Sequence, residues 1–218
     1  MTPLTTPYAH WPLHGLRIRT PRLELRLPDT ALTDRLAAVA AAGVHAPDRM
    51  PFTVPWTDGE PGTVARAVFQ HVLSTVANWS VDDWCLSLAV VHDGEVVGRQ
   101  DLMARSFAVT REAKTGSWLG LAHQGQGFGT EMRAAVLHLA FEGLGARYAV
   151  SAAMTDNPAS LGVSRRLGYL PDGLTVAAVR GTPTALRRLR LDRARWAEHR
   201  RVEVSVEGLD ACRGDFGV

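Results

Sequence analysis

The chain has 218 residues, of which 46% are hydrophobic, and it carries 24 lysine and arginine residues against 22 aspartate and glutamate residues. This length predicts one domain, with or without extensions, and enough apolar side chains for a sizeable core. The balanced charge gives no electrostatic argument for nucleic-acid binding, and no apolar run approaches the ~18 residues that a membrane-spanning helix needs. The 2 cysteines lie far apart, and no signal-peptide pattern is present, which favours a reduced, cytoplasmic protein.

Apolar periodicity and turn-forming residues divide the chain into three parts. Residues 1–15 are expected to form an irregular N-terminal arm, residues 16–191 the domain, and residues 192–218 a weakly patterned C-terminal extension. In that extension Trp196 is expected to pack back on the domain, and the last residues are expected to fray.

Strand and helix patterns alternate along the domain. The expected elements are a strand at 16–27, helices at 31–42 and 63–79, a hairpin of strands at 84–91 and 96–103, a strand at 115–121, a helix at 131–142, a strand at 148–154, a short helix at 158–167, and strands at 174–179 and 185–191. A long loop at 45–62 and an irregular connection at 106–114 separate some of them. This order predicts a mixed α/β or α+β sandwich with six or seven strands and about four helices.

A glycine-rich stretch at 124–130 lies between an expected strand and an expected helix. Gly125, Gly127 and Gly129 alternate there, so the backbone can turn tightly and approach another molecule closely. The unpaired N–H groups at the start of the following helix point into the same loop and make an anion site. A dinucleotide fingerprint would need glycine at Thr130, and a P-loop would need a lysine that is absent here.

The pattern Q-x-x-G-x-G, formed by Gln124, Gly127 and Gly129, resembles the pyrophosphate-binding motif of the GNAT superfamily of acyl-CoA-dependent N-acyltransferases. Two further segments are similar to the branch of ribosomal-protein N-terminal acetyltransferases. They are Thr20-Pro21-Arg22-Leu23-Glu24-Leu25-Arg26 at the first strand, and Asn157-Pro158-Ala159-Ser160 followed by Arg166-Leu167-Gly168-Tyr169. The resemblance covers roughly residues 16–190 and implies a mostly antiparallel GNAT sheet.

The resemblance also implies where the coenzyme lies. The strands 115–121 and 148–154 would splay apart to hold its pantetheine arm, with backbone bonds near Leu119 and Leu121. The implied coenzyme-binding residues are Leu119, Leu121, Gln124, Gly125, Gln126, Gly127, Phe128, Gly129, Thr130, Asn157, Ser160 and Arg166. The Phe128 side chain fits core packing, Asn157 fits an N-cap before Pro158, and Arg166 also fits a solvated helix face.

The catalytic and acceptor residues are less constrained. The resemblance implies that Ser160 would protonate the departing thiolate, and Asp101 is one candidate for the general base. Other candidates for the base are Glu112, His123 and Asp58, because the glutamate that related enzymes use has no counterpart at 170–186. Phe52 and Trp56 are expected to line the acceptor pocket together with the 104–114 connection.

The expected reaction is transfer of an acyl group from coenzyme A to a primary amine, by direct attack in a ternary complex. The donor is acetyl-CoA or succinyl-CoA, with Arg99 or Arg105 as partners for a second carboxylate, and no metal is required. The acceptor is a protein or peptide N-terminus or a small-molecule amine, and self-association as a homodimer is left open. The alternative is a catalytically silent domain that senses acyl-CoA.

Overall fold

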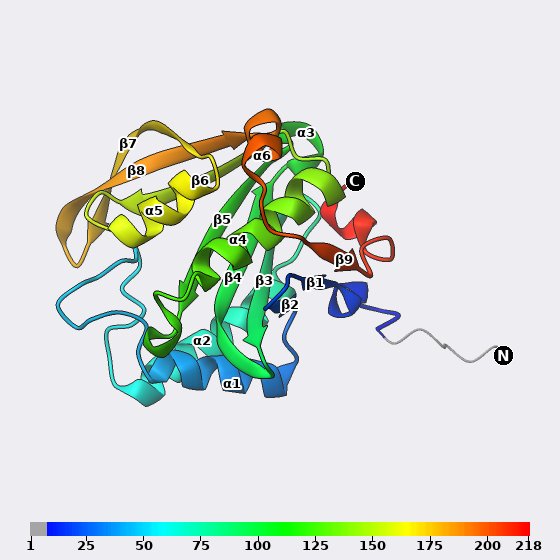
Figure 1. The fold of residues 1–218 in the computed structure, drawn as a ribbon. Helices are drawn as coiled ribbons and strands as arrows, with labels where there is room; N and C mark the ends of the chain where they lie inside the picture. Colours follow the sequence, from blue (N-terminus) through cyan, green and yellow to red (C-terminus); the bar gives the residue numbers. More distant parts are fainter. Residues whose placement is uncertain (1–7) are drawn as a thin grey trace.

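One open sheet of nine strands runs through residues 8–218, the part of the chain that this computed structural model describes (Figure 1). The strand order is β7-β8-β6-β5-β4-β3-β2-β1-β9, and β5 and β6 form the one parallel pair within those residues. The strands are β1 Arg17–Arg19, β2 Glu24–Arg26, β3 Asp83–His92, β4 Glu95–Arg105, β5 Glu112–Leu119, β6 Tyr148–Met154, β7 Leu170–Val179, β8 Thr182–Asp192 and β9 Ser205–Glu207. The helices are α1 Thr30–Ala41, α2 Pro61–Ala77, α3 Phe107–Thr110, α4 Phe128–His138, α5 Pro158–Arg166 and α6 Arg193–His199.

Helices cover both faces of this sheet. Trp118 and Leu119 follow each other on β5, so their side chains point to opposite faces. Trp118 packs in the core formed with α1 and α2, whereas Leu119 packs in the core that contains α4. Figure 1 shows α4 crossing in front of the central strands, with α1 and α2 below and behind them. The expected mixed, mostly antiparallel architecture is therefore confirmed.

The number of strands exceeds the expected six or seven. The stretch 16–27 forms two antiparallel strands, β1 and β2, rather than one. Pro21 lies at the break, and the Thr20 side-chain and backbone groups close a turn onto Leu23. Proline has no N–H to donate to a ladder, which explains why the strand ends there. The other additional strand is β9.

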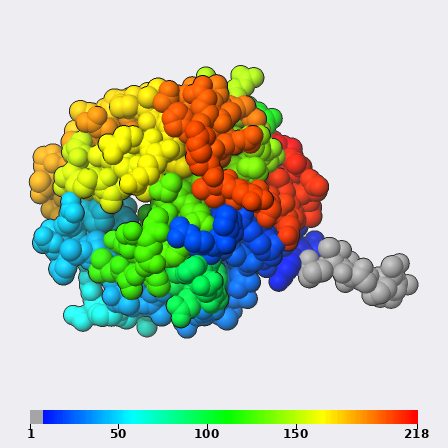
Figure 2. All heavy atoms as spheres, viewed as in Figure 1, coloured from blue at the N-terminus to red at the C-terminus, as the bar shows by residue number. Residues whose placement is uncertain are grey.

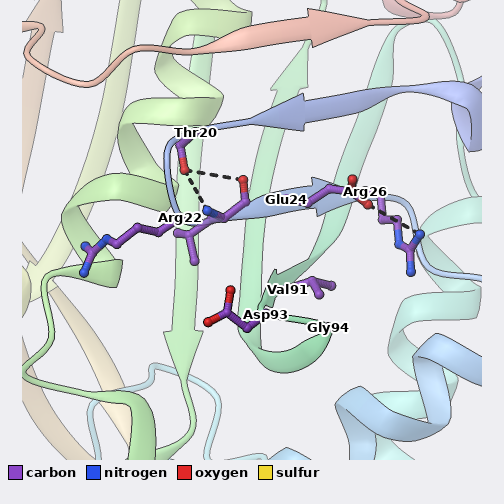
Figure 3. A pocket seen from close by; sticks show the side chains of 8 residues that line it. Thr20, Arg22, Glu24, Arg26, Val91, Asp93 and Gly94 are labelled. Atoms are coloured by element: carbon purple, nitrogen blue, oxygen red, sulfur yellow. Dashed lines mark hydrogen bonds and ion pairs between the residues drawn. The ribbon is translucent and has the colours of Figure 1, made fainter.

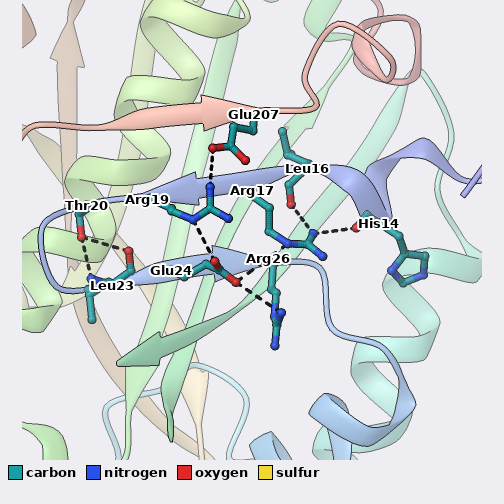
Figure 4. A network of polar contacts seen from close by, with 9 residues as sticks. All are labelled: His14, Leu16, Arg17, Arg19, Thr20, Leu23, Glu24, Arg26 and Glu207. Atoms are coloured by element: carbon teal, nitrogen blue, oxygen red, sulfur yellow. Dashed lines mark hydrogen bonds and ion pairs between the residues drawn. The ribbon is translucent and has the colours of Figure 1, made fainter. Parts of the chain in front are cut away.

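The C-terminal residues are ordered into the domain, so the expectation that they fray is wrong. β9 pairs with β1, and Arg19 on β1 contacts both Glu24 of β2 and Glu207 of β9 (Figure 4). The ring of Phe216 is fully buried, and the Trp79 indole N–H donates to the Asp215 carbonyl. Short elements anchored by single aromatic residues leave little periodicity in a sequence, which is why this segment reads as weakly patterned.

Trp196 does pack on the domain, as expected. It is 1% exposed and stacks on Phe141 with 5.9 Å between ring centroids. Of the expected N-terminal arm, residues 1–7 lie outside the described residues. Leu13, in a short turn just before β1, is fully buried. Between residues 8 and 218, no helix has the length and apolar character needed to cross a membrane.

Candidate active site

A cleft opens where β5 and β6 separate. The two strands pair only through residues 112–114 and 148–150; beyond that point β5 continues beside β4, and β6 beside β8. The splay expected between these strands is thus confirmed. The cleft measures about 1530 Å³, and it is lined by β5, β6, the glycine loop, the start of α5 and the loop after α1. In Figure 2 it shows as a hollow between that loop (cyan), the glycine loop (green) and α5 (yellow).

The glycine loop presents unpaired amides to one end of the cleft. Gly125 and Gly127 have φ angles of 75° and 85°, a conformation that side chains with a Cβ rarely adopt. Helix α4 begins at Phe128, earlier than expected, so Gly129 and Thr130 belong to its first turn. Among the hydrogen bonds of residues 8–218, none is donated by a backbone N–H of residues 125–129. These amides and the positive end of the helix dipole therefore lie where the sequence predicts an anion site.

Five of the seven residues at 124–130 line the cleft, whereas Gln126 is exposed outside it and Phe128 is buried. The five are Gln124, Gly125, Gly127, Gly129 and Thr130. Phe128 is 2% exposed and packs against His92, in agreement with the expected core role of its ring. The Gln124 side-chain nitrogen donates to the Val44 and Leu119 carbonyls, so this amide holds the loop to its neighbours.

Arg22 and Glu131 clamp the loop from the other side, and neither was assigned a role from the sequence. The Glu131 carboxylate is 6% exposed; it accepts hydrogen bonds from the Thr20 hydroxyl and from the Arg22 backbone and guanidinium. Arg22 also donates to the Gln126 carbonyl and lies over the Phe128 ring at 4.7 Å. Figure 3 shows the Arg22 side chain leaving a shallow pocket of about 380 Å³ beside the β1–β2 turn and extending towards α4.

The opposite wall of the cleft carries a buried ion pair. Asp101 and Arg99 lie on the same face of β4, opposite Gly116 and Trp118 of β5. One Asp101 carboxylate oxygen lies 3.0 Å from the Arg99 guanidinium, and the other accepts a 2.9 Å hydrogen bond from the Ser87 hydroxyl. The structure therefore places Asp101 in the cleft, as expected of a catalytic residue, but with both oxygens already engaged.

The other candidates for the base lie outside the cleft. Glu112 pairs with Arg190, and Asp58 pairs with Arg180. Neither carboxylate is among the residues that line the cleft, and His123 is also absent from them. Arg105, considered as a partner for a second carboxylate, pairs with Asp83 at the surface.

His71 is a cleft residue that the sequence analysis missed. It lies on α2 and lines the cleft together with Arg99 and Asp101. Although His71 is an exposed residue, desolvation and then the Arg99 charge lower the pKa of its imidazole, while the Asp101 charge acts in the opposite direction. The ring is therefore neutral near pH 7 and can accept a proton. In the sequence, only the spacing of His71 from Val68 and Val72, which lie on the buried face of α2, indicates that His71 is close to that face.

The remaining expected residues converge on the cleft, except that of the 104–114 connection only Lys114 lines it. Phe52 and Trp56 line it and form an aromatic wall together with Trp118. The ring centroids of Phe52 and Trp56 are 4.9 Å apart, and those of Trp56 and Trp118 are 5.7 Å apart. Asn157 caps α5 as expected, because its side-chain oxygen accepts from the Ser160 N–H. The cleft lining also contains Leu119, Leu121, Asn157, Ser160 and Arg166.

Comparison with known proteins agrees with this geometry. Residues 22–170 match the family model described as an acetyltransferase (GNAT) domain. RimJ from Mycobacterium smegmatis, in complex with CoA-disulfide, superimposes with a TM-score of 0.69 at 17% identity, covering 88% of this chain and 98% of RimJ. RimL, a ribosomal L7/L12 α-N-protein acetyltransferase in complex with coenzyme A, gives a TM-score of 0.61 at 20% identity, covering 79% of this chain and 95% of RimL. A ribosomal-protein-serine acetyltransferase structure from Vibrio cholerae gives 0.61 at 21% identity, covering 81% of this chain and 97% of that one. Since the family match spans the glycine loop, both splayed strands and α5, the chain belongs to the GNAT acetyltransferase family.

Proposed function

We propose that the protein transfers an acetyl group from acetyl-CoA to the α-amine of a protein or peptide, by direct attack of the amine in a ternary complex. The observation that carries this proposal is the cleft itself. One end presents the free amides of residues 125–129, and the other presents His71, Asp101 and an aromatic wall. An anionic coenzyme and a nitrogen nucleophile can thus meet between β5 and β6.

The donor half of the cleft suits coenzyme A. Amides at 125–129 would bind the pyrophosphate. Beyond Lys114 the β5 edge has lost its β6 partner, so backbone groups near Leu119 can bond the pantetheine amides. A backbone N–H there would also stabilise the oxyanion formed at the thioester carbonyl.

The acceptor half suits direct attack. Cys85 lines the cleft, but burial raises the pKa of its thiol to about 12, so it stays protonated and is a poor acyl carrier. We assign the general base to His71, because its imidazole is neutral, whereas the Asp101 carboxylate is held by Arg99 and Ser87. Asp101 then stabilises the imidazolium that forms. An α-amine, with a pKa of about 8, loses its proton far more easily than a lysine side chain at about 10.4.

Ser160→Ala tests the role of the serine hydroxyl in departure of the thiol. We expect kcat to fall about tenfold, the value of one lost hydrogen bond to a charged group, while KM for acetyl-CoA changes little. The N-cap bond survives in this variant because it uses the Ser160 backbone N–H, so the melting temperature should stay constant. An unchanged kcat would remove Ser160 from the chemistry.

Arg22→Ala tests the clamp on the glycine loop. Loss of Arg22 leaves the buried Glu131 carboxylate without its cation, so we expect about 1–2 kcal/mol of destabilisation, discounted because Arg22 is half-exposed. The loosened loop should raise KM for acetyl-CoA about tenfold, whereas turnover of S-acetylpantetheine, which has no pyrophosphate, should be unaffected. The double variant Arg22→Ala/Glu131→Gln, which also removes the orphaned charge, should regain stability but not affinity. Equal losses with both donors would instead indicate a general disturbance of the fold.

Steady-state assays with a panel of acceptors and donors test the function as a whole. We expect release of coenzyme A from acetyl-CoA with short peptides that have a free N-terminus, and none with the same peptides after N-terminal blocking. Faster turnover of small-molecule amines would assign the acceptor to that class instead. A preference for succinyl-CoA would change the donor, and binding of acetyl-CoA without turnover of any amine would favour a silent sensor.

A further inference from the structure

A cation without a counter-ion lies beside the cleft. Arg133, on the second turn of α4, is 5% exposed and belongs to the cleft lining. Its guanidinium donates to the Ser164 hydroxyl at 2.8 Å and more weakly to the Ser117 hydroxyl at 3.4 Å. Its Nε atom is buried and has no acceptor. Among the ion pairs formed within residues 8–218, none includes Arg133.

This arrangement is costly unless an anion arrives. An unpaired buried charge is among the most unfavourable groups in a protein interior. Burial lowers the pKa of the Arg133 guanidinium, and only the Tyr169 phenol acts in the opposite direction. Arginine nevertheless stays protonated in proteins, so the group remains a cation. Arg99, another arginine of the cleft lining, is paired with the Asp101 carboxylate.

The position of Arg133 matches the thiol end of a coenzyme A molecule bound as proposed. Arg133 is four positions after Gly129 on α4, so its Cα lies about 6 Å further along the helix axis than the amide of Gly129. It bonds Ser117 on the splayed part of β5. Through Ser164, whose hydroxyl donates to the Ser160 carbonyl, it also supports the first turn of α5. Hydroxyl groups and one cation therefore surround the place where the carbon–sulfur bond would break.

We propose that the Arg133 guanidinium stabilises the coenzyme A thiolate as it leaves. This inference rests on the proposed function. The amine nitrogen forms a bond to the thioester carbonyl carbon and its proton passes to His71. The carbon–sulfur bond then breaks, and its electron pair stays on sulfur. The thiolate is held beside Arg133 with Ser160 as hydrogen-bond donor. It then takes up a proton from solvent, while the His71 imidazolium releases its proton to solvent.

The absence of a counter-ion for Arg133 among residues 8–218 fits this role. Acetyl-CoA carries no charge at its thioester, so a fixed cation gains its partner only as negative charge develops on sulfur. An interaction that is stronger in the transition state than in the ground state raises kcat rather than lowering KM. A carboxylate placed permanently against Arg133 would remove that difference.

Titration of the bound coenzyme tests the proposal without any acceptor. The absorbance of the thiolate reports the pKa of the thiol of free coenzyme A and of coenzyme A saturating the protein. We expect the thiol pKa of the wild-type complex to lie well below the ordinary value of about 8.5, and the Arg133→Met complex to return to that value or higher. The Arg133→Met variant should also lower kcat for acetyl transfer about a hundredfold, with KM for acetyl-CoA unchanged. Arg133→Lys, which keeps the charge but not the planar fork, should be intermediate.

The control variant is Arg66→Met, which removes an exposed cation of α2 that does not line the cleft and should leave the thiol pKa and kcat unchanged. Equal thiol pKa values in wild type and Arg133→Met would overturn the proposal. A wild-type preference for succinyl-CoA that disappears in Arg133→Met would also overturn it, because Arg133 would then bind the free carboxylate of the succinyl group. Failure of the wild-type protein to bind coenzyme A at all would contradict the proposed function instead.

Discussion

Gly129→Val is expected to abolish acetyl-CoA binding and to leave the protein folded. A Cβ at Gly129 would meet Val163 at 3.6 Å and Leu119 at 3.9 Å, which are ordinary contacts, so the added Cβ fits in the free protein. Gly129, Val163 and Leu119 all line the cleft, however. The valine methyl groups would therefore occupy the space through which the pyrophosphate approaches the α4 amides. Calorimetry with acetyl-CoA and a thermal melt measure the two effects separately.

Gly62→Val is the matched control for this experiment. Gly62 is the second residue of α2, just as Gly129 is the second residue of α4, and a Cβ there meets nothing within 4 Å. Gly62→Val therefore has the same effect on stability of a valine at the start of a helix, but Gly62 does not line the cleft. Retained acetyl-CoA affinity in Gly129→Val would show that the glycine loop does not bind the coenzyme.

His71→Gln is expected to lower kcat at pH 7 on the order of a hundredfold, since a positioned general base contributes at least that much. The lowered pKa of His71 means that the ring stays neutral until the pH falls below the ordinary histidine value of about 6.5. In the wild type, kcat should thus be retained through neutral pH and fall only on the acid side of that value. In His71→Gln this fall of kcat at acid pH, the acid limb of the profile, should be absent. The measurement is kcat against pH at saturating acetyl-CoA and peptide.

Two further variants sharpen this result. His138 also has a lowered pKa caused by burial, but it lies on α4 away from the cleft lining, so His138→Gln should keep both the rate and the acid limb. Asp101→Asn separates the two candidates for the base. If Asp101 accepts the proton, that variant loses the acid limb and His71→Gln retains it, which would reverse the assignment.

Much of the site is encoded locally. The alternation of Gly125, Gly127 and Gly129 after an apolar strand predicts the anion-binding turn, because positive φ angles and close approach require glycine. Asn157 before Pro158 predicts the start of α5, since an amide oxygen at this position caps the Ser160 N–H. The Asp93-Gly94 turn predicts the β3–β4 hairpin in the same way. Each of these signals lies within a few residues of the structure it determines.

The sequence by itself therefore determined the glycine loop and the helix that Asn157 caps, and the family resemblance implied the two strands that splay beside them. Only the tertiary structure decided the contacts between distant segments. Arg22 reaches Glu131 across 109 residues of chain, β9 pairs with β1, and His71 enters the cleft from α2. In the sequence, the spacing of Arg133 along α4 is compatible with a buried position. Only the packing of the described residues shows that its guanidinium is buried without a counter-ion. The physical reason is that periodicity and turn chemistry are local, whereas ion pairs, pKa values and cleft walls depend on how separate elements pack.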